Sequence, residues 1–123
     1  MKFVKCREGD KVSDFLRLHG RVFGSWPPQS SKEIFYWKYV NNPVRDEIPV
    51  FLLYKRGKLV AARGYVVAHI SGLEKTKGYQ SADLMVHPEF RGQGIYKQLN
   101  NYCAQVHSES GKRLLFSFPR PRP

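Results

Sequence analysis

SADLMVHPEFRGQGIYKQLNNYC, residues 81–103, decides the fold, because an extended apolar run there meets a basic, glycine-bearing turn and then a helical pattern. The apolar run favours a strand, which ends at Pro88 because proline has no N–H to donate to a ladder. Gly92 and Gly94 free the backbone of the turn that follows. Apolar residues then recur at spacings of three and four, which predicts a helix over residues 94–109.

The turn lies at the predicted N-terminus of this helix. The first N–H groups of a helix have no intrahelical acceptor, and the helix dipole adds about half a positive charge there. Arg91 and Lys97 add whole charges, and Gly92 and Gly94 leave room for a phosphate beside the amides. The pattern therefore predicts a diphosphate ligand. The alternative is a strand-to-helix turn whose glycines serve geometry alone, and neither a Walker loop nor the Rossmann spacing is present.

The segment DLMVHPEFRGQGIYKQL, residues 83–99, resembles the signature of the GNAT acetyltransferase superfamily. In that signature a strand ending in V-x-P precedes R/Q-x-x-G-x-G/A and a helix, and the loop amides hold the pyrophosphate of acetyl-coenzyme A. Arg91 takes the first place of the motif and Gly94 the fourth. Tyr96 takes the sixth, which is usually Gly or Ala. The block WKYVNNP, residues 37–43, resembles an upstream block of some branches of the superfamily.

The resemblance implies a cofactor site and a reaction. The implied cofactor contacts are Leu84, Met85 and Val86 on the strand edge, for the pantetheine arm, and Arg91, Gly92, Gln93, Gly94, Ile95 and Tyr96 in the loop. The implied reaction is direct transfer of the acetyl group to an amine. Asp83 is the first candidate for the base, ahead of Glu89 and Glu47; the alternative for Asp83 is a salt bridge to a lysine or arginine. The N–H of Val86 would polarise the carbonyl, and no residue matches the acid of the family.

The resemblance also implies the fold class. This is an α/β (α+β) fold with a GNAT-like mixed, mostly antiparallel sheet of about five strands and three helices, in the order β-α-α-β-β-β-α-β. The sequence itself favours strands at residues 2–6, 49–53, 58–70, 78–86 and 112–118, and helices at residues 12–23, 31–40 and 94–109. Gly57 predicts a hairpin between the second and third strands, and the alternation resets at Gly64, which indicates a bulge there. The last two strands, joined by a helix, are expected to be parallel. Asp10 or Ser13 is expected to cap the first helix, and residues 26–29 are expected to form a loop. The rings of the second helix are expected in the core, the alternative being that Trp37 or Tyr36 lines an acceptor pocket.

Residues 1–118 are expected to form one acyltransferase-like domain, followed by a basic PRPRP tail at residues 119–123. The last helix and two strands that are usual in the family are missing from this pattern. Pairing of the C-terminal strand with a second copy would cover the exposed edge, so a homodimer is one expectation. His19 is expected to pack or to lie on the surface, and Cys103 to lie in the core.

Composition limits the remaining function classes. The 123 residues include 21 Lys and Arg against 10 Asp and Glu, for a net charge of +11, which attracts polyanions. Two cysteines give neither a disulfide framework nor metal spacing, so no metal site is expected. No apolar run has the length of a membrane span or signal core, and a cytoplasmic location is expected.

Three functions remain open from the sequence. The first is an N-acetyltransferase that uses acetyl-coenzyme A on an unidentified small-molecule or peptide amine. The second is a catalytically weak or inactive half-domain that binds coenzyme A or a protein partner, which the short C-terminus favours. The third is a basic nucleic-acid binder. It is less favoured because the charges are spread along the chain and the aromatic residues follow helical core patterns.

Overall fold

The computed structural model describes residues 1–7, 11–24, 28–72, 76–111 and 113–116. In chain order the elements are β1 (Lys2–Lys5), α1 (Val12–Phe23), α2 (Pro28–Phe35), a π-helical turn (Tyr36–Val40), β2 (Val50–Lys55), β3 (Lys58–His69), β4 (Lys77–Val86), a 3₁₀ turn (Pro88–Phe90), α3 (Ile95–Glu109) and β5 (Arg113–Phe116). The expected fold class and element order are confirmed. The tail expected at residues 119–123 lies outside the described residues.

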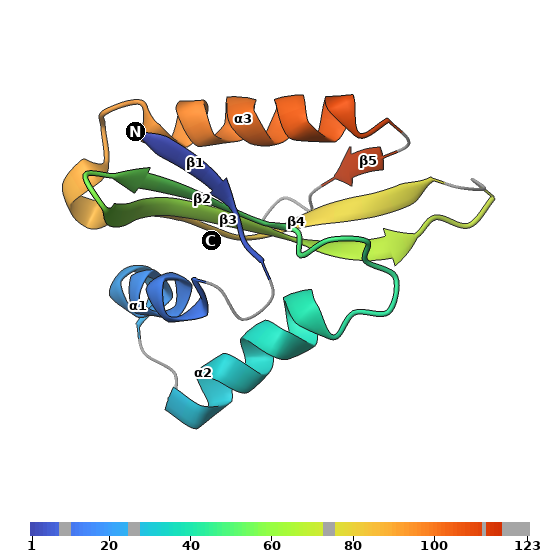
Figure 1. Ribbon diagram of the computed structural model, residues 1–123, viewed down its shortest axis with the longest axis horizontal. Helices are drawn as coiled ribbons and strands as arrows, with labels where there is room; N and C mark the ends of the chain where they lie inside the picture. Colours follow the sequence, from blue (N-terminus) through green and yellow to red (C-terminus); the bar gives the residue numbers. More distant parts are fainter. Residues whose placement is uncertain (8–10, 25–27, 73–75, 112, 117–123) are drawn as a thin grey trace, which may run out of the picture.

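The five strands form one sheet in the order β1-β2-β3-β4-β5. Neighbouring strands are antiparallel except β4 and β5, which are parallel and joined through α3, as the sequence predicted. Helix α3 covers one face of the sheet, and α1 and α2 cover the other (Figure 1). The sheet is therefore the middle of three layers.

Strand β2 reads as an almost continuous apolar run because both of its faces are covered. Phe51 and Leu53 pack in the core on the α3 side, whereas Val50 and Leu52 pack in the core on the α1 and α2 side. Cys103 lies in the α3-side core, as predicted, and burial raises the pKa of its thiol to about 11. It is thus a protonated core residue at neutral pH.

The ends of the first two helices differ from expectation. Helix α1 has the expected bounds, but Lys11 occupies its N-cap in a left-handed conformation and no side chain caps it. The expected Ser13 cap is therefore wrong, and Asp10 lies outside the described residues. Helix α2 begins at Pro28, so Pro28 and Gln29 are helical rather than loop. Proline is well suited to the first helical position, where its missing N–H costs nothing.

The chain leaves α2 through one π-helical turn, Tyr36–Val40. The N–H of Asn41 closes it by donating to the carbonyl of Tyr36 at 2.7 Å. Such single π turns are rare and occur frequently at functional sites. Periodicity predicted only a helix here, because a one-residue widening leaves no clear mark in an apolar pattern.

The β2–β3 hairpin follows its sequence signal closely. Arg56 and Gly57 form its two-residue turn, with φ of 52° and 75°. Two positive φ values in succession define a type I′ turn, whose twist matches that of the flanking strands. The hairpin expected from the glycine is confirmed.

The ladder between β3 and β4 contains a bulge. Ala62 pairs with Met85, and Gly64 pairs with Ala82, so β4 has one more residue than β3 between these pairs. Asp83 lies in this bulge with φ of 44°. The sequence alternation indicated an irregularity at Gly64, but the extra residue belongs to the partner strand.

Gly64 serves a different purpose. A Cβ placed on it would lie 2.4 Å from the hydroxyl of Tyr39, which is fully buried. The missing side chain therefore lets the Tyr39 ring lie directly against β3. This brings the hydroxyl to the sheet at the level of the bulge.

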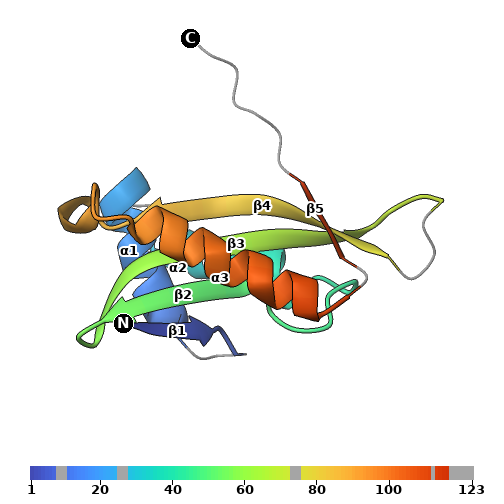
Figure 2. The same cartoon turned by 90° about the horizontal axis from the view of Figure 1, so that it is seen from above.

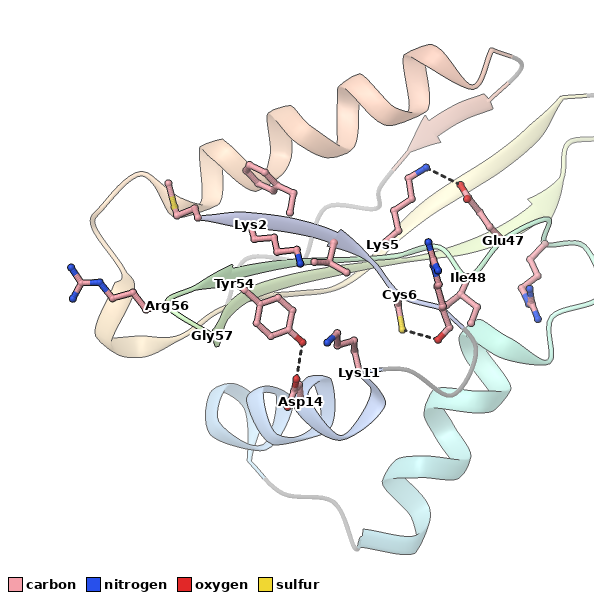
Figure 3. Close-up of a pocket in the computed structure, with 15 residues that line it drawn as sticks. Lys2, Lys5, Cys6, Lys11, Asp14, Glu47, Ile48, Tyr54, Arg56 and Gly57 are labelled. Atoms are coloured by element: carbon pink, nitrogen blue, oxygen red, sulfur yellow. Dashed lines mark hydrogen bonds and ion pairs between the residues drawn. The ribbon is translucent and has the colours of Figure 1, made fainter.

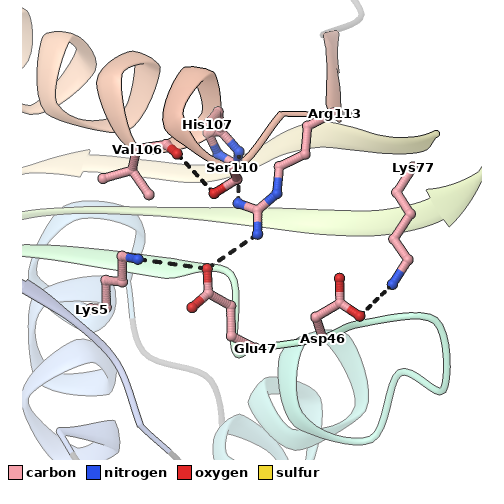
Figure 4. Close-up of polar contacts among 8 residues, drawn as sticks. All are labelled: Lys5, Asp46, Glu47, Lys77, Val106, His107, Ser110 and Arg113. Carbon is pink, nitrogen blue, oxygen red and sulfur yellow. Dashed lines mark hydrogen bonds and ion pairs between the residues drawn. The ribbon is translucent and has the colours of Figure 1, made fainter. Parts of the chain in front are cut away.

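Strand β5 is attached to the sheet by charged contacts at its first residue (Figure 4). Arg113 donates to the carboxylate of Glu47 at 3.2 Å, and Lys5 lies 3.7 Å from the same oxygen. The Arg113 guanidinium also contacts Nδ1 of His107 at 3.2 Å and covers the ring of Tyr79. The start of β5 is thus tied to α3, to β4 and to the loop before β2.

The parallel pairing of β5 covers only the first part of β4. It joins residues 113–116 to residues 77–80, and the view from above shows β5 turning away from β4 (Figure 2). Beyond Gln80 the outer edge of β4 has no strand partner among the described residues. The sheet therefore opens along residues 81–86.

His107, which Arg113 of β5 contacts, is buried among aromatic rings. Its ring centroid lies 5.4, 4.7 and 4.9 Å from those of Phe51, Tyr65 and Tyr79, and its exposed fraction is 3%. Within the described residues Nε2 has no hydrogen-bond partner. Burial, with the charge of Arg113, lowers the pKa of His107 to about 4. The imidazole is therefore neutral at neutral pH.

A depressed histidine pKa makes stability depend on pH in a defined direction. The unfolded chain takes up the proton near pH 6.5, so the contribution of neutral His107 is complete above that value and is lost as the pH falls toward about 4. A shift of this size corresponds to about 3 kcal/mol. Between pH 6.5 and 4 we expect the free energy of unfolding of the wild type to fall by about 3 kcal/mol more than that of His107→Phe. Urea denaturation at several pH values measures both proteins. Identical pH profiles of the two proteins would contradict the assignment.

Candidate functional site

The candidate site begins at the turn between β4 and α3. Gly92 and Gly94 have φ of 78° and 74°, a conformation that side-chain-bearing residues rarely adopt. A Cβ on either glycine would meet nothing within 4 Å, so the turn is open on its outer side. Gly94 is the N-cap of α3, and its carbonyl accepts from Gln98 at 3.1 Å. The amides of the first helical turn have no acceptor within the helix.

The side chains of this turn leave its surface exposed and cationic. Arg91 and Lys97 are exposed, and Nε of Arg91 donates to the carbonyl of Val86 at 3.3 Å. Tyr96 is 52% exposed and so does not fill the turn, whereas Ile95 anchors the helix in the core with 3% exposure. The large residue at the sixth motif position is thus accommodated at the surface.

The edge of β4 that leads to the turn has backbone groups that do not pair with β3. The N–H of His87 donates to the carbonyl of Val60 at 2.8 Å. Because such bonds alternate along an antiparallel ladder, the N–H groups of Val86 and Leu84 point away from β3. Met85 differs: its backbone faces β3, and its side chain is buried on the α1 and α2 side. The opening of the sheet therefore exposes the groups of Leu84 and Val86.

Asp83 lies on this same stretch of β4. Its carboxylate contacts side chains of α1 and of the π turn, on the side of the sheet opposite α3. Tyr39 donates to Oδ2 at 2.5 Å, and the Lys38 ammonium lies 3.0 Å from the same oxygen. Nε2 of His19 lies 3.7 Å from Oδ1. The Asp83 side chain is 15% exposed. Asp83 thus makes the salt bridge that was the alternative expectation, and it does so at the open edge of β4.

Burial shifts the pKa values of two groups that contact Asp83. Burial raises the pKa of Tyr39, so its hydroxyl remains a donor to the carboxylate. Burial also lowers the pKa of His19, and the nearby Asp83 opposes that shift. At neutral pH the cluster therefore contains the protonated hydroxyl of Tyr39 and the neutral imidazole of His19.

His19 was not a site candidate from the sequence. It lies on the buried face of α1 at 5% exposure, between Phe15 and Phe23, whose rings it contacts. The spacing of four between these three residues places His19 on the apolar face, and this was the only signal available. Its neighbour Asp83 is too distant in sequence to be recognised.

A second polar contact fixes the other side of the bulge. Arg63 lies opposite it on β3, donates to the hydroxyl of Ser81 at 2.9 and 3.2 Å, and donates to the side-chain oxygen of Asn100 on α3. Its guanidinium lies 5.1 Å from the ring centroid of Tyr65. No local sequence pattern indicated a role for Arg63. The residue connects α3 to β4 at the point where the sheet opens.

The two reserve candidates for the base lie elsewhere. Glu89 is 63% exposed and pairs with Arg21 at 3.5 Å and Lys58 at 3.7 Å. Glu47 belongs to the contacts that attach β5. Of the three carboxylates, Asp83 is the one on the open edge of β4.

A surface hollow lies away from this edge. It has a volume of about 1160 Å³ and follows β1, at the other side of the sheet (Figure 3). It is lined by basic side chains and by Asp14 and Glu47, and Tyr54 donates to Asp14 there at 2.7 Å. A second hollow of about 420 Å³ lies between α1 and the β2–β3 hairpin. Neither contains Asp83 or the glycine turn.

Two further observations apply to the part of the chain that the structure describes. No three His, Cys, Asp or Glu side chains there lie close enough to hold a metal ion. No helix in the same ranges is long and apolar enough to cross a membrane.

Known proteins resemble this chain in sequence. A family model described as an acetyltransferase (GNAT) domain matches residues 5–123. An uncharacterized N-acetyltransferase of Methanocaldococcus jannaschii is 27% identical over 110 residues, which cover 86% of this chain and 48% of that protein. The chain thus spans about half the length of this curated relative.

Solved structures resemble the chain in fold. An aminoglycoside acetyltransferase from an uncultured soil metagenomic sample, in complex with sisomicin, matches with a TM-score of 0.74 and 24% identity, over 97% of this chain and 77% of that one. The acetyltransferase AAC(6')-Iy, in complex with the bisubstrate analogue CoA-S-monomethyl-acetylneamine, matches with a TM-score of 0.71 and 15% identity. This match covers 98% of this chain and 80% of that one. Glucosamine-6-phosphate N-acetyltransferase of Arabidopsis thaliana matches with a TM-score of 0.65 and 18% identity, over 97% of this chain and 82% of that one. At these identities the likeness establishes the shared fold.

The hydrogen bond from Tyr39 to Asp83 is expected to contribute strongly to stability. Tyr39→Phe removes a donor to a mostly buried carboxylate, and we expect a loss of about 2 kcal/mol. Tyr54→Phe is the matched control, because its acceptor Asp14 is 35% exposed and water can replace the donor. Chemical denaturation measures both variants. Equal losses in the two would contradict a special role of the Asp83 cluster.

Proposed function

The chain belongs to the GNAT acetyltransferase family, and we propose that it binds acetyl-coenzyme A at residues 91–96 and transfers the acetyl group directly to an amine. The single observation that carries this proposal is that two structural features lie next to each other. An open glycine turn at the N-terminus of α3 lies just after the stretch of β4 whose outer edge has no strand partner among the described residues. A diphosphate and a peptide-like arm need these two surfaces side by side.

The turn fits a diphosphate. The unpaired amides of the first turn of α3 and the helix dipole favour an anion, and the glycines leave the approach clear. Arg91 is exposed beside them and can exchange its contact with the Val86 carbonyl for a phosphate. Gly92, Gln93, Gly94, Ile95 and Tyr96 would contribute backbone N–H groups.

The edge of β4 fits the pantetheine arm. Amide groups of the arm can pair with the outward backbone groups of Leu84 and with the carbonyl of Val86, as an added strand would. Met85 would contribute to the wall of this edge rather than to the pairing, because its backbone faces β3. The proposed arm therefore ends beside the Asp83 bulge.

Bound acetyl-coenzyme A supplies an acetyl group activated as a thioester. Asp83 would act as the base that takes the proton of the attacking amine. The outward N–H of Val86 would donate to the carbonyl oxygen, where negative charge develops. The proposal assigns no general acid to the leaving thiolate.

A small-molecule or peptide amine is the proposed acceptor. The aminoglycoside and glucosamine-6-phosphate acetyltransferases that share the fold carry such small amines in their names. Trp37, next to Lys38 on the π turn, is 74% exposed, so the expected core position is wrong for this ring. Its exposure supports the alternative that it lines an acceptor pocket.

Calorimetric titration with acetyl-coenzyme A tests the cofactor site. Gly94→Glu places a carboxylate and a side chain in the turn, and we expect affinity to fall at least about tenfold. Gly72→Glu is the matched control, because Gly72 also has a positive φ of 82° and open surroundings but lies in the turn that follows β3. Absence of binding in all three proteins would refute the cofactor proposal, and equal binding in all three would refute the position of the site.

A homodimer through β5 belongs to the same proposal. Strand β5 ends the sheet, and Leu114 and Leu115 are 44% and 40% exposed on it. Pairing with a second copy would cover both the edge and these side chains. We expect sedimentation to give a dimer at micromolar concentration that Leu114→Lys weakens. A monomer in the wild type would refute this part.

A further inference from the structure

We propose that Lys38 is a site of self-acetylation, with its own ε-amine as the first acceptor at the Asp83 carboxylate. The proposal rests on the function proposed above. It identifies the class of acceptor that the site meets first, a primary amine carried by the chain itself.

The geometry places this amine where an acceptor must be. A base has to lie within hydrogen-bond reach of the proton that it removes. The Lys38 ammonium lies 3.0 Å from Oδ2 of Asp83, and Tyr39 holds the same oxygen in position. The π turn supplies both residues. A primary amine therefore already occupies the contact that the proposed mechanism requires.

The pair is also accessible from the open edge of β4. Asp83 lies within residues 81–86, where β5 no longer pairs with β4. The Lys38 side chain is 24% exposed and that of Asp83 is 15% exposed, so the contact is reachable but mostly removed from water. A thioester bound along this edge would lie next to the Lys38 amine.

The other lysine–carboxylate pairs among the described residues lack this combination. Lys58 pairs with Glu89, Lys77 with Asp46 and Lys5 with Glu47. Those carboxylates are 63%, 68% and 42% exposed, and none lies on the open edge of β4. Lys38 is thus distinguished from these lysines by position as well as by burial.

The step balances without a further reactant. Nζ of Lys38 gives a proton to Asp83 and bonds to the acetyl carbonyl carbon, and the carbon–sulfur bond breaks with its electron pair on sulfur. The ammonium loses two protons in total: one ends on the thiol, and the other passes from Asp83 to solvent. The products are an amide at Lys38 and free coenzyme A.

Acetylation changes the charge of the site. The amide of acetylated Lys38 carries no positive charge, so it cannot neutralise Asp83 as the ammonium does. Tyr39 still donates to Oδ2. The carboxylate then has an unbalanced negative charge at the open edge, which favours the ammonium of an external acceptor.

Peptide mass spectrometry of the full chain after incubation with acetyl-coenzyme A tests the proposal. We expect Lys38 to be acetylated at least about tenfold faster than Lys32, an exposed lysine of the adjoining helix α2, and than Lys97, which is exposed beside the turn. Asp83→Asn should slow the modification of Lys38 alone. Gly94→Glu should slow it as well, and Gly72→Glu should not. A rate constant independent of protein concentration would assign the transfer to a single chain.

Calorimetry separates the two ways of failing. Lys38→Gln should bind acetyl-coenzyme A as the wild type does, because Lys38 contacts the bulge and not the glycine turn. No binding in the wild type would refute the proposed function. Intact binding with Lys38 modified no faster than Lys32 would refute self-acetylation and leave the proposed function standing, and an unchanged rate in Asp83→Asn would refute the role of Asp83.

Discussion

The bulge of β4 at Asp83 is the constraint on which the candidate site depends. A left-handed φ at a residue with a side chain costs about 1 to 2 kcal/mol. The contacts of the Asp83 carboxylate with Tyr39 and Lys38 offset this cost, and Gly64 gives Tyr39 the room to make its contact. Without the extra residue in β4, the side chain at position 83 would not keep its direction, since a shift of one residue moves a side chain to the other face.

The opening of the sheet and the bulge occur on the same stretch, and charged contacts at both ends explain why. Arg113 fixes the start of β5 to Glu47 and His107, so β5 pairs with β4 where β4 begins. Arg63 then connects Ser81 to Asn100 of α3, which fixes β4 to the α3 layer at residue 81. The strand can thus lose its outer partner and still keep its shape.

Local signals made much of the fold predictable. Pro88, the glycines of the turn and the periodicity of α3 gave the strand, turn and helix, and Gly57 gave the hairpin, because each acts within a few residues. The bulge, the π turn and the partners of Asp83 were not predictable in this way. Lys38 and Tyr39 reach Asp83 across more than forty residues of sequence. Only the resemblance to a family pointed to Asp83, and it did not indicate that His19 lies beside it.

The two oxygens of Asp83 have different surroundings, and this decides how one carboxylate can serve structure and chemistry. Oδ2 holds both strong contacts, with Tyr39 and Lys38. Oδ1 faces His19 at 3.7 Å, and burial keeps that imidazole neutral. An external ammonium that approached Oδ1 would meet a carboxylate already neutralised by Lys38, so electrostatic attraction would be weak. Loss of the Lys38 charge would restore that attraction while Tyr39 still held Oδ2, and the state of Lys38 would therefore determine whether the site favours a cationic acceptor.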